Sequence, residues 1–148
     1  MTVKSWAAAA AVVLSVLPAV SQARDTALYL PFDKVIADMT AAKKLDGTVK
    51  FYLAGVQPKG NVSVVLPGVV TNKKTNAFNK SDNDACEWVL QSAILQMNEA
   101  AKNAGANAVT NIVSFYKKNE RKDPATYECH AGAIMAGVAL KGDLSKVQ

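Results

Sequence analysis

The segment from Cys86 to Ala104 constrains the fold more than any other part of the chain, because its apolar residues recur at three- and four-residue spacing. Its apolar positions are Cys86, Val89, Leu90, Ala93, Ile94, Met97, Ala101 and Ala104. Ser81 and Asp84 precede it as a weak capping box, and Gly105 follows it as a C-terminal cap. The pattern predicts one long amphipathic helix, whose apolar face needs a second layer to cover it.

Strand-like segments around this helix predict that the second layer is a sheet. The predicted strands are Thr26–Pro31, Thr48–Leu53, Val62–Val70 with an interruption at Pro67-Gly68, Val109–Tyr116 and Tyr127–Leu140. Asp33 is expected to cap a short helix that runs to Ala42. Thr71–Lys80 is expected to be a polar loop, and Lys117–Pro124 a charged turn that joins the last two strands as a hairpin. The order β-α-β-β-α-β-β predicts an α+β fold, in which an antiparallel sheet of about five strands carries both helices on one face.

Residues 1–23 have the layout of a secretory signal peptide. Lys4 is their only charged residue, an apolar run follows from Trp6 to Val20, and Ser21-Gln22-Ala23 suits a cleavage site. The run is shorter than the ~20 apolar residues of a membrane span, and an uncleaved N-terminal anchor is the alternative. We therefore expect cleavage between Ala23 and Arg24, a single domain over residues 24–148, and a periplasmic or secreted protein.

Export decides how Cys86 and Cys129 are interpreted. In an oxidising compartment two cysteines most simply pair with each other, and this bond would connect the first turn of the long helix to the start of the last strand. A reactive thiol and a metal ligand are the alternatives, and both need additional partners. The prediction is a Cys86–Cys129 disulfide.

The one histidine, His130, lies in the run Glu128-Cys129-His130. Strand alternation places Glu128 and His130 on one face and Cys129 on the other. A tetrahedral metal site needs three or four ligands, and no second histidine exists to supply them. A soft metal would require an unpaired Cys129, with Met135 or Met97 nearby. Glu128 and His130 are thus the metal-ligand candidates, and a surface pair is the favoured interpretation.

Motifs for catalysis and cofactor binding are missing from the sequence. There is no G-x-S-x-G elbow, and the Walker-like spacing of Gly132 and Gly137 is followed by Val138-Ala139 where a phosphate-binding lysine is needed. Asn107 and Asn111 suit a turn between helix and strand, with a ligand role as the alternative. We predict that the protein is not an enzyme and has no cofactor.

The formal net charge of +5 comes with four basic pairs, which are separated in sequence and fall in predicted loops or element ends. They are Lys43-Lys44, Lys73-Lys74, Lys117-Lys118 and Arg121-Lys122. Scattered solubilising charge is the favoured interpretation. Outside the cytoplasm a basic surface would meet anionic lipid or polysaccharide sooner than DNA, so no nucleic-acid partner is expected.

Two sets of residues resemble known proteins. The run A-G-A-N-A-V-T-N-I at 104–112, after a helix and before a paired strand, is similar to the core of the YbjQ-type heavy-metal-binding domains and to the helix and A-N-A-V strand of RcsF. The segments at 71–82, 85–88 and 127–142 resemble a group of small exported proteobacterial proteins, often named excinuclease ATPase subunit. The resemblance implies a YbjQ/RcsF-like domain, and the missing Walker lysine gives no support to an ATPase.

These observations predict a non-enzymatic binding or interaction module that is stabilised by one disulfide and acts on an unknown envelope partner or ligand. Homo-oligomerisation through sheet edges is one expected mode of interaction. The alternative is a metal- or redox-responsive envelope protein that uses Cys86, Cys129 and His130. An envelope enzyme is a third and weaker hypothesis.

Overall fold

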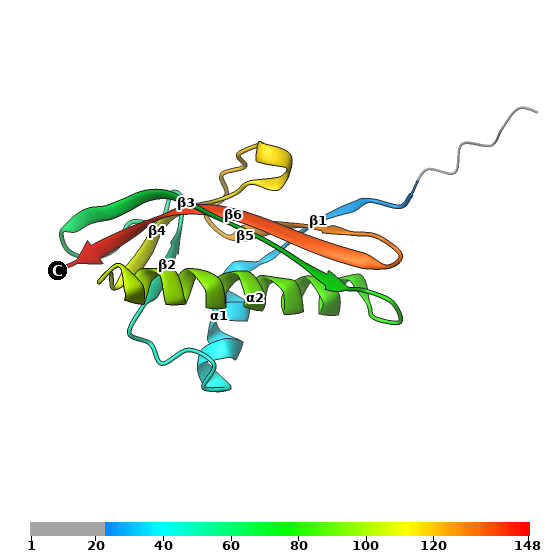
Figure 1. The fold of residues 1–148 in the computed structure, drawn as a ribbon, viewed down its shortest axis with the longest axis horizontal. Helices are drawn as coiled ribbons and strands as arrows, with labels where there is room; N and C mark the ends of the chain where they lie inside the picture. Colours follow the sequence, from blue (N-terminus) through cyan, green and yellow to red (C-terminus); the bar gives the residue numbers. More distant parts are fainter. Residues whose placement is uncertain (1–22) are drawn as a thin grey trace, which may run out of the picture.

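The structure, a computed structural model, describes residues 23–148, so most of the predicted signal peptide lies outside the described residues. Figure 1 shows one sheet with both helices on the same side of it. The elements are β1 (Thr26–Pro31), α1 (Phe32–Ala41), β2 (Lys50–Leu53), β3 (Val62–Asn76), α2 (Asp82–Asn103), β4 (Ala108–Ser114), the 3-10 turn η1 (Tyr116–Lys118), β5 (Thr126–Ala131) and β6 (Met135–Val147). The predicted α+β class is confirmed, with six strands in place of about five.

The sheet is organised around β6, which pairs along its length with β3. On its other edge β6 pairs with β5 near its start and with β4 near its end. Strand β1 then adds to β5 in antiparallel fashion, and β2 adds to β4 in parallel. The sheet is therefore mixed, and the prediction of a wholly antiparallel sheet is wrong. The chain passes through β3 and α2 between β2 and β4, and such a crossover is what allows two strands to run in parallel.

The expected loop at Thr71–Lys80 is also wrong for its first six residues, because β3 continues to Asn76. These residues pair with Met135–Leu140 of β6, and the Thr71 hydroxyl donates a hydrogen bond to Gln96 of α2. An all-polar run gives no alternating signal of apolar residues, so only the tertiary pairing identifies this half of the strand.

The predicted final strand Tyr127–Leu140 is in fact two strands, β5 and β6, joined by a tight turn at residues 132–134. In this turn the Gly132 amide donates to the Met135 carbonyl at 2.8 Å. The expected pairing of β4 with the final strand is made by β6, which continues beyond the predicted end to Val147. The turn was missed because the run of small apolar residues around Gly132 lacks the polar residues that usually mark turns.

The caps of α2 are as predicted: the Ser81 hydroxyl accepts from the Asp84 amide at 3.1 Å, and Gly105 has a φ of +69° after the last turn. The cap of α1 is not. This helix begins at Phe32 directly after Pro31 and has no side-chain cap, so Asp33 lies in its first turn. A carboxylate in that position still interacts favourably with the positive end of the helix.

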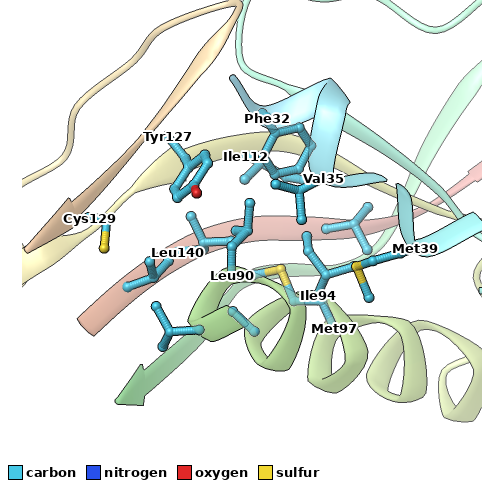
Figure 2. Packing of buried hydrophobic residues seen from close by; sticks show 14 of the residues in the cluster. Phe32, Val35, Met39, Leu90, Ile94, Met97, Ile112, Tyr127, Cys129 and Leu140 are labelled. Atoms are coloured by element: carbon cyan, nitrogen blue, oxygen red, sulfur yellow. The ribbon is translucent and has the colours of Figure 1, made fainter. Parts of the chain in front are cut away.

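The core lies between the sheet and the two helices, as Figure 2 shows in close view. Its largest members include Phe32, Val35 and Met39 from α1 together with Leu90, Ile94 and Met97 from α2. The predicted disulfide is confirmed: Cys86 and Cys129 are bonded, both are fully buried, and they tie the beginning of α2 to β5. Neither helix within residues 23–148 combines the length and apolar character needed to cross a membrane.

Candidate interaction sites

Strand β5 presents its two candidate ligand residues on the face of the sheet that the helices leave open. Tyr127, Cys129 and Ala131 are buried against the helical layer, whereas Glu128 and His130 alternate with them on the other side. The alternation predicted from the sequence is therefore present. His130 Nε2 lies 2.6 Å from Glu128 Oε1, so these two side chains form a hydrogen bond.

Two further residues, Asp25 and Tyr116, complete a cluster that sequence reasoning missed. Asp25 Oδ1 lies 2.9 Å from His130 Nδ1. The Tyr116 ring stacks on the imidazole with centroids 3.4 Å apart, and its hydroxyl donates to Asp25 Oδ2 at 3.4 Å. Asp25 precedes β1 and Tyr116 lies in η1, so no local spacing connects either of them to β5. Only the pairing of β1 with β5 and the return of the η1 loop over the open face bring them together.

The cluster is arranged to hold a hydrogen-bonded imidazole rather than to surround a metal ion. A carboxylate accepts but does not donate, so both bonds form together when the ring carries a proton on each nitrogen. The carboxylates of Asp25 and Glu128 lie at different nitrogens of one ring and do not converge on a common point. Over residues 23–148 no group of three His, Cys, Asp or Glu side chains is placed to hold a metal ion.

Tyr116 is the member of this cluster with a shifted pKa. Burial, and then the negative charges of Asp25 and Glu128, raise the pKa of the Tyr116 phenol. Loss of its proton would place a third negative charge beside two carboxylates. The phenol therefore keeps its proton and donates it to Asp25.

The sulfur atoms considered for a soft metal are dispersed. Cys129 is bonded to Cys86 inside the core, and Met97 is fully buried among the core residues. Met135 instead begins β6 at the tip of the β5–β6 hairpin, where its side chain is half-exposed.

The two asparagines considered as ligands serve the backbone. The side-chain Nδ2 of Asn107 donates to the Val147 carbonyl at 2.9 Å, and its Oδ1 accepts from the Val147 backbone N–H at 2.8 Å. The side-chain amide therefore pairs with the end of β6 as a peptide group would. Asn111 has a φ of +52° at the register shift of β4, a conformation that asparagine tolerates better than most residues. Asn107 is thus explained by its bonds to the backbone of β6, and Asn111 by the backbone conformation of β4.

The outer edge of β3 is the second candidate site. Within residues 23–148, β3 pairs only with β6, along one of its edges. Its other edge has no partner strand among these residues. Its first part carries large apolar side chains that are between 41% and 50% exposed, namely Val62, Val64, Val65, Leu66 and Val70. Free backbone groups beside exposed apolar side chains form a template for pairing with another strand.

The four basic pairs do not gather on one element. Lys73-Lys74 lies inside β3, contrary to the expected loop, while Lys43-Lys44 follows α1. Lys117-Lys118 and Arg121-Lys122 both lie between β4 and β5. Within this last segment, Arg121 is paired with Asp123 at 3.2 Å and lies over the Tyr29 ring.

No protein-family model, no curated protein and no solved structure matches this chain. The resemblance to YbjQ-type domains and RcsF therefore stays a prediction.

Proposed function

We propose that this protein is a non-enzymatic interaction module of the periplasm or the secreted fraction, stabilised by Cys86–Cys129, which self-associates through the outer edge of β3. The observation that carries the proposal is the run Val62–Leu66, which has four exposed apolar residues and no charge and lies along an edge that no strand within residues 23–148 pairs with. Natural edge strands are usually protected by charged residues or by proline. Val62–Leu66 contains neither, and Pro67 directly follows it.

A second copy of the chain fits this edge by symmetry. Antiparallel pairing of β3 with itself about a two-fold axis at Val64 sets Val62 opposite Leu66 of the copy and Val64 opposite its own equivalent. Apolar side chains then face apolar side chains, which stabilises antiparallel pairs. The same operation leaves Lys73 and Lys74 outside the paired segment, so no like charges oppose each other.

The state of association tests the proposal. We expect the wild-type chain to be a dimer by size-exclusion chromatography with light scattering, and Val64→Lys to be a monomer. The lysine would meet its own copy across the axis, and like charges directly opposite each other destabilise strand pairing. Asn72→Lys is the matched control, because it adds the same charge on the same strand outside the paired segment, and it should remain dimeric.

A wild-type chain that stays monomeric at its highest soluble concentration would contradict self-association. A Val64→Lys variant that still dimerises would place the interface elsewhere. Circular dichroism of each variant must match the wild type, since Val64 is half-exposed and a folded variant is expected.

The proposed location has its own test. Mass spectrometry of protein recovered from an oxidising compartment without reductant should give a chain that begins at Arg24 and is two hydrogens lighter than the dithiol. A mass that includes residues 1–23 would contradict cleavage. Free thiols or a bound metal would favour the alternative role as a redox- or metal-responsive protein.

The burial of both cysteines supports a structural disulfide over a responsive one. Reactive cysteines are partly exposed and lie in electropositive surroundings. Cys86 and Cys129 are instead fully buried among apolar side chains. Each nitrogen of His130 lies beside a carboxylate, which leaves no free ring nitrogen for a metal.

A further inference from the structure

A pocket of about 500 Å³ opens on the uncovered face of the sheet, beside the His130 cluster and away from the first half of β3. It lies against the β5–β6 hairpin, the residues before β1 and the second half of β3, Thr71–Asn76, whereas the first half is Val62–Val70. The lining residues that matter here are Asp25, Lys74, Tyr116, His130, Ile134 and Gly137. Its volume is within the range of pockets that hold small organic ligands.

On the floor of the pocket, Gly137 of β6 contributes no side chain. Gly137 is paired with His130 on one side and with Lys74 on the other, and residues paired in this way share a face of the sheet. A Cβ atom at Gly137 would lie 3.6 Å from the Lys73 carbonyl oxygen and 3.7 Å from Lys74 Cγ, which are ordinary contacts. The first atom of a side chain at this position is therefore accommodated, and the atoms beyond it would take up space in the pocket.

One wall of the pocket is apolar and another is aromatic. Ile134 and Met135 at the hairpin tip are 65% and 47% exposed. The stacked rings of Tyr116 and His130 form the other wall. An apolar molecule lying on Gly137 would cover exposed apolar surface on the hairpin, which favours its transfer from water.

The charge that faces this apolar space is that of Lys74. None of the described acidic residues forms an ion pair with it, whereas the Arg24 guanidinium is already held by Asp82 at 2.8 and 3.0 Å and by the Gly132 carbonyl at 2.8 Å. Both oxygens of Asp25 accept hydrogen bonds within the His130 cluster. His130 lies two strands from Lys74, roughly 10 Å away, so an anion beside Lys74 is separated from those carboxylates.

We propose that this pocket binds a small amphiphile with an apolar body and one carboxylate, its body over Gly137 against Ile134 and Met135 and its carboxylate beside Lys74. The site is distinct from the edge of β3 proposed above. Its occupancy does not depend on self-association.

Decanoate, kept below its micellar concentration, is a suitable probe. We expect it to shift the amide resonances of residues 132–137 and of Lys74 in 1H–15N spectra of the protein exported from the full chain. The wild type should bind decanoate more tightly than decanol, because only decanoate offers a charge to Lys74. Lys74→Met should weaken decanoate about three- to fivefold and leave decanol unchanged, as expected for loss of one exposed ion pair.

Gly137→Val tests the pocket itself and should abolish the binding of both probes, because the side chain occupies the floor. Ala27→Val is its control: Ala27 is paired with His130 on the same face but does not line the pocket. Lys73→Met is the control for Lys74→Met, since Lys73 belongs to the helix-facing set of β3. Both controls, and Val64→Lys, should bind decanoate as the wild type does.

Absence of decanoate binding in the folded wild type would overturn the proposal. Resonance shifts confined to residues that do not line the pocket would overturn it as well, as would Gly137→Val binding with wild-type affinity. Equal effects of Lys73→Met and Lys74→Met would show that net charge, and not this site, attracts the probe. Melting temperatures of all variants establish that each is folded.

Discussion

The two halves of β3 are built in opposite ways. The first half, Val62–Val70, is rich in valine yet largely exposed, whereas the second half, Thr71–Asn76, is polar yet held against the body of the protein. Both halves pair with β6 on one edge. The difference is the layer beneath them: the Thr71 hydroxyl bonds Gln96 of α2, and Thr71 itself is 2% exposed.

Hydrophobicity and burial are therefore uncoupled along this strand. In its second half, Thr71, Lys73 and Thr75 are more buried than the residues between them, although all six side chains are polar. In its first half, apolar side chains remain exposed along the edge that no other described strand pairs with. Apolar surface that a folded chain leaves open in this way is more simply explained by an interaction than by stability.

Removing the disulfide should cause the largest loss of stability and should affect the two halves of β3 to different extents. The Cys86→Ala/Cys129→Ala variant should lose about 4 kcal/mol of unfolding free energy, from the chain entropy of a loop of this length. Urea denaturation measures the loss. Amide exchange should accelerate in Thr71–Asn76 more than in Val62–Leu66, because the bond anchors the α2 layer beneath the second half. Equal acceleration in both halves would mean that α2 does not hold them differently.

Tyr127 of β5 is buried against the same helical layer. Its hydroxyl is buried without a hydrogen-bond partner among the described residues, so Tyr127→Phe should raise the unfolding free energy by about 1 kcal/mol. Burial raises the pKa of Tyr127, so the unfolded chain loses this proton first as the pH rises. The contribution of the protonated Tyr127 phenol to the free energy of unfolding is therefore fully present below about pH 10 and declines above it.

Urea denaturation at pH 7 and at about pH 11 measures both effects, and Tyr127→Phe should show the smaller alkaline decline. Tyr29→Phe is the control, because Tyr29 is an exposed tyrosine of the neighbouring strand. A destabilised Tyr127→Phe would mean that the hydroxyl has a partner, for example a bound water.

A reciprocal pair of substitutions sharpens the comparison between the halves. Thr71→Val replaces a polar residue with an apolar one and should still cost about 1 kcal/mol, because the hydrogen bond to Gln96 is lost. Val64→Thr makes the opposite change in the first half and should alter stability by less than about 0.5 kcal/mol. Urea denaturation at concentrations where the chain is monomeric measures both. A larger loss of unfolding free energy for Val64→Thr than for Thr71→Val would show that the side chains of the first half are packed against the rest of the protein.

The smallest expected effect concerns the cluster on the open face. Asp25→Asn should lower the pKa of Tyr116 towards its ordinary value, because one of the negative charges that raise it is removed, while burial keeps part of the shift. Global stability should change by less than about 0.5 kcal/mol, since Asp25 is exposed. Alkaline absorbance titration detects the change. The difference between Asp25→Asn and wild type should vanish when both carry Tyr116→Phe.

The sequence alone determined the features that rest on local patterns. The three- and four-residue spacing and the Ser81 and Gly105 caps define α2 because helix hydrogen bonds connect near neighbours. The α+β class and the Cys86–Cys129 pair also followed, since two cysteines leave one intramolecular pairing. Alternation along β5 was sufficient to place Glu128 and His130 together on one face.

The tertiary structure alone decided the features that depend on distant partners. The polar half of β3 becomes a strand because β6 pairs with it, and the apolar half stays exposed because nothing in residues 23–148 covers its outer edge. Asp25 and Tyr116 reach His130 only through strand pairing and the return of the η1 loop. Backbone hydrogen bonds between strands are indifferent to side-chain type, and for that reason a sequence pattern does not report them.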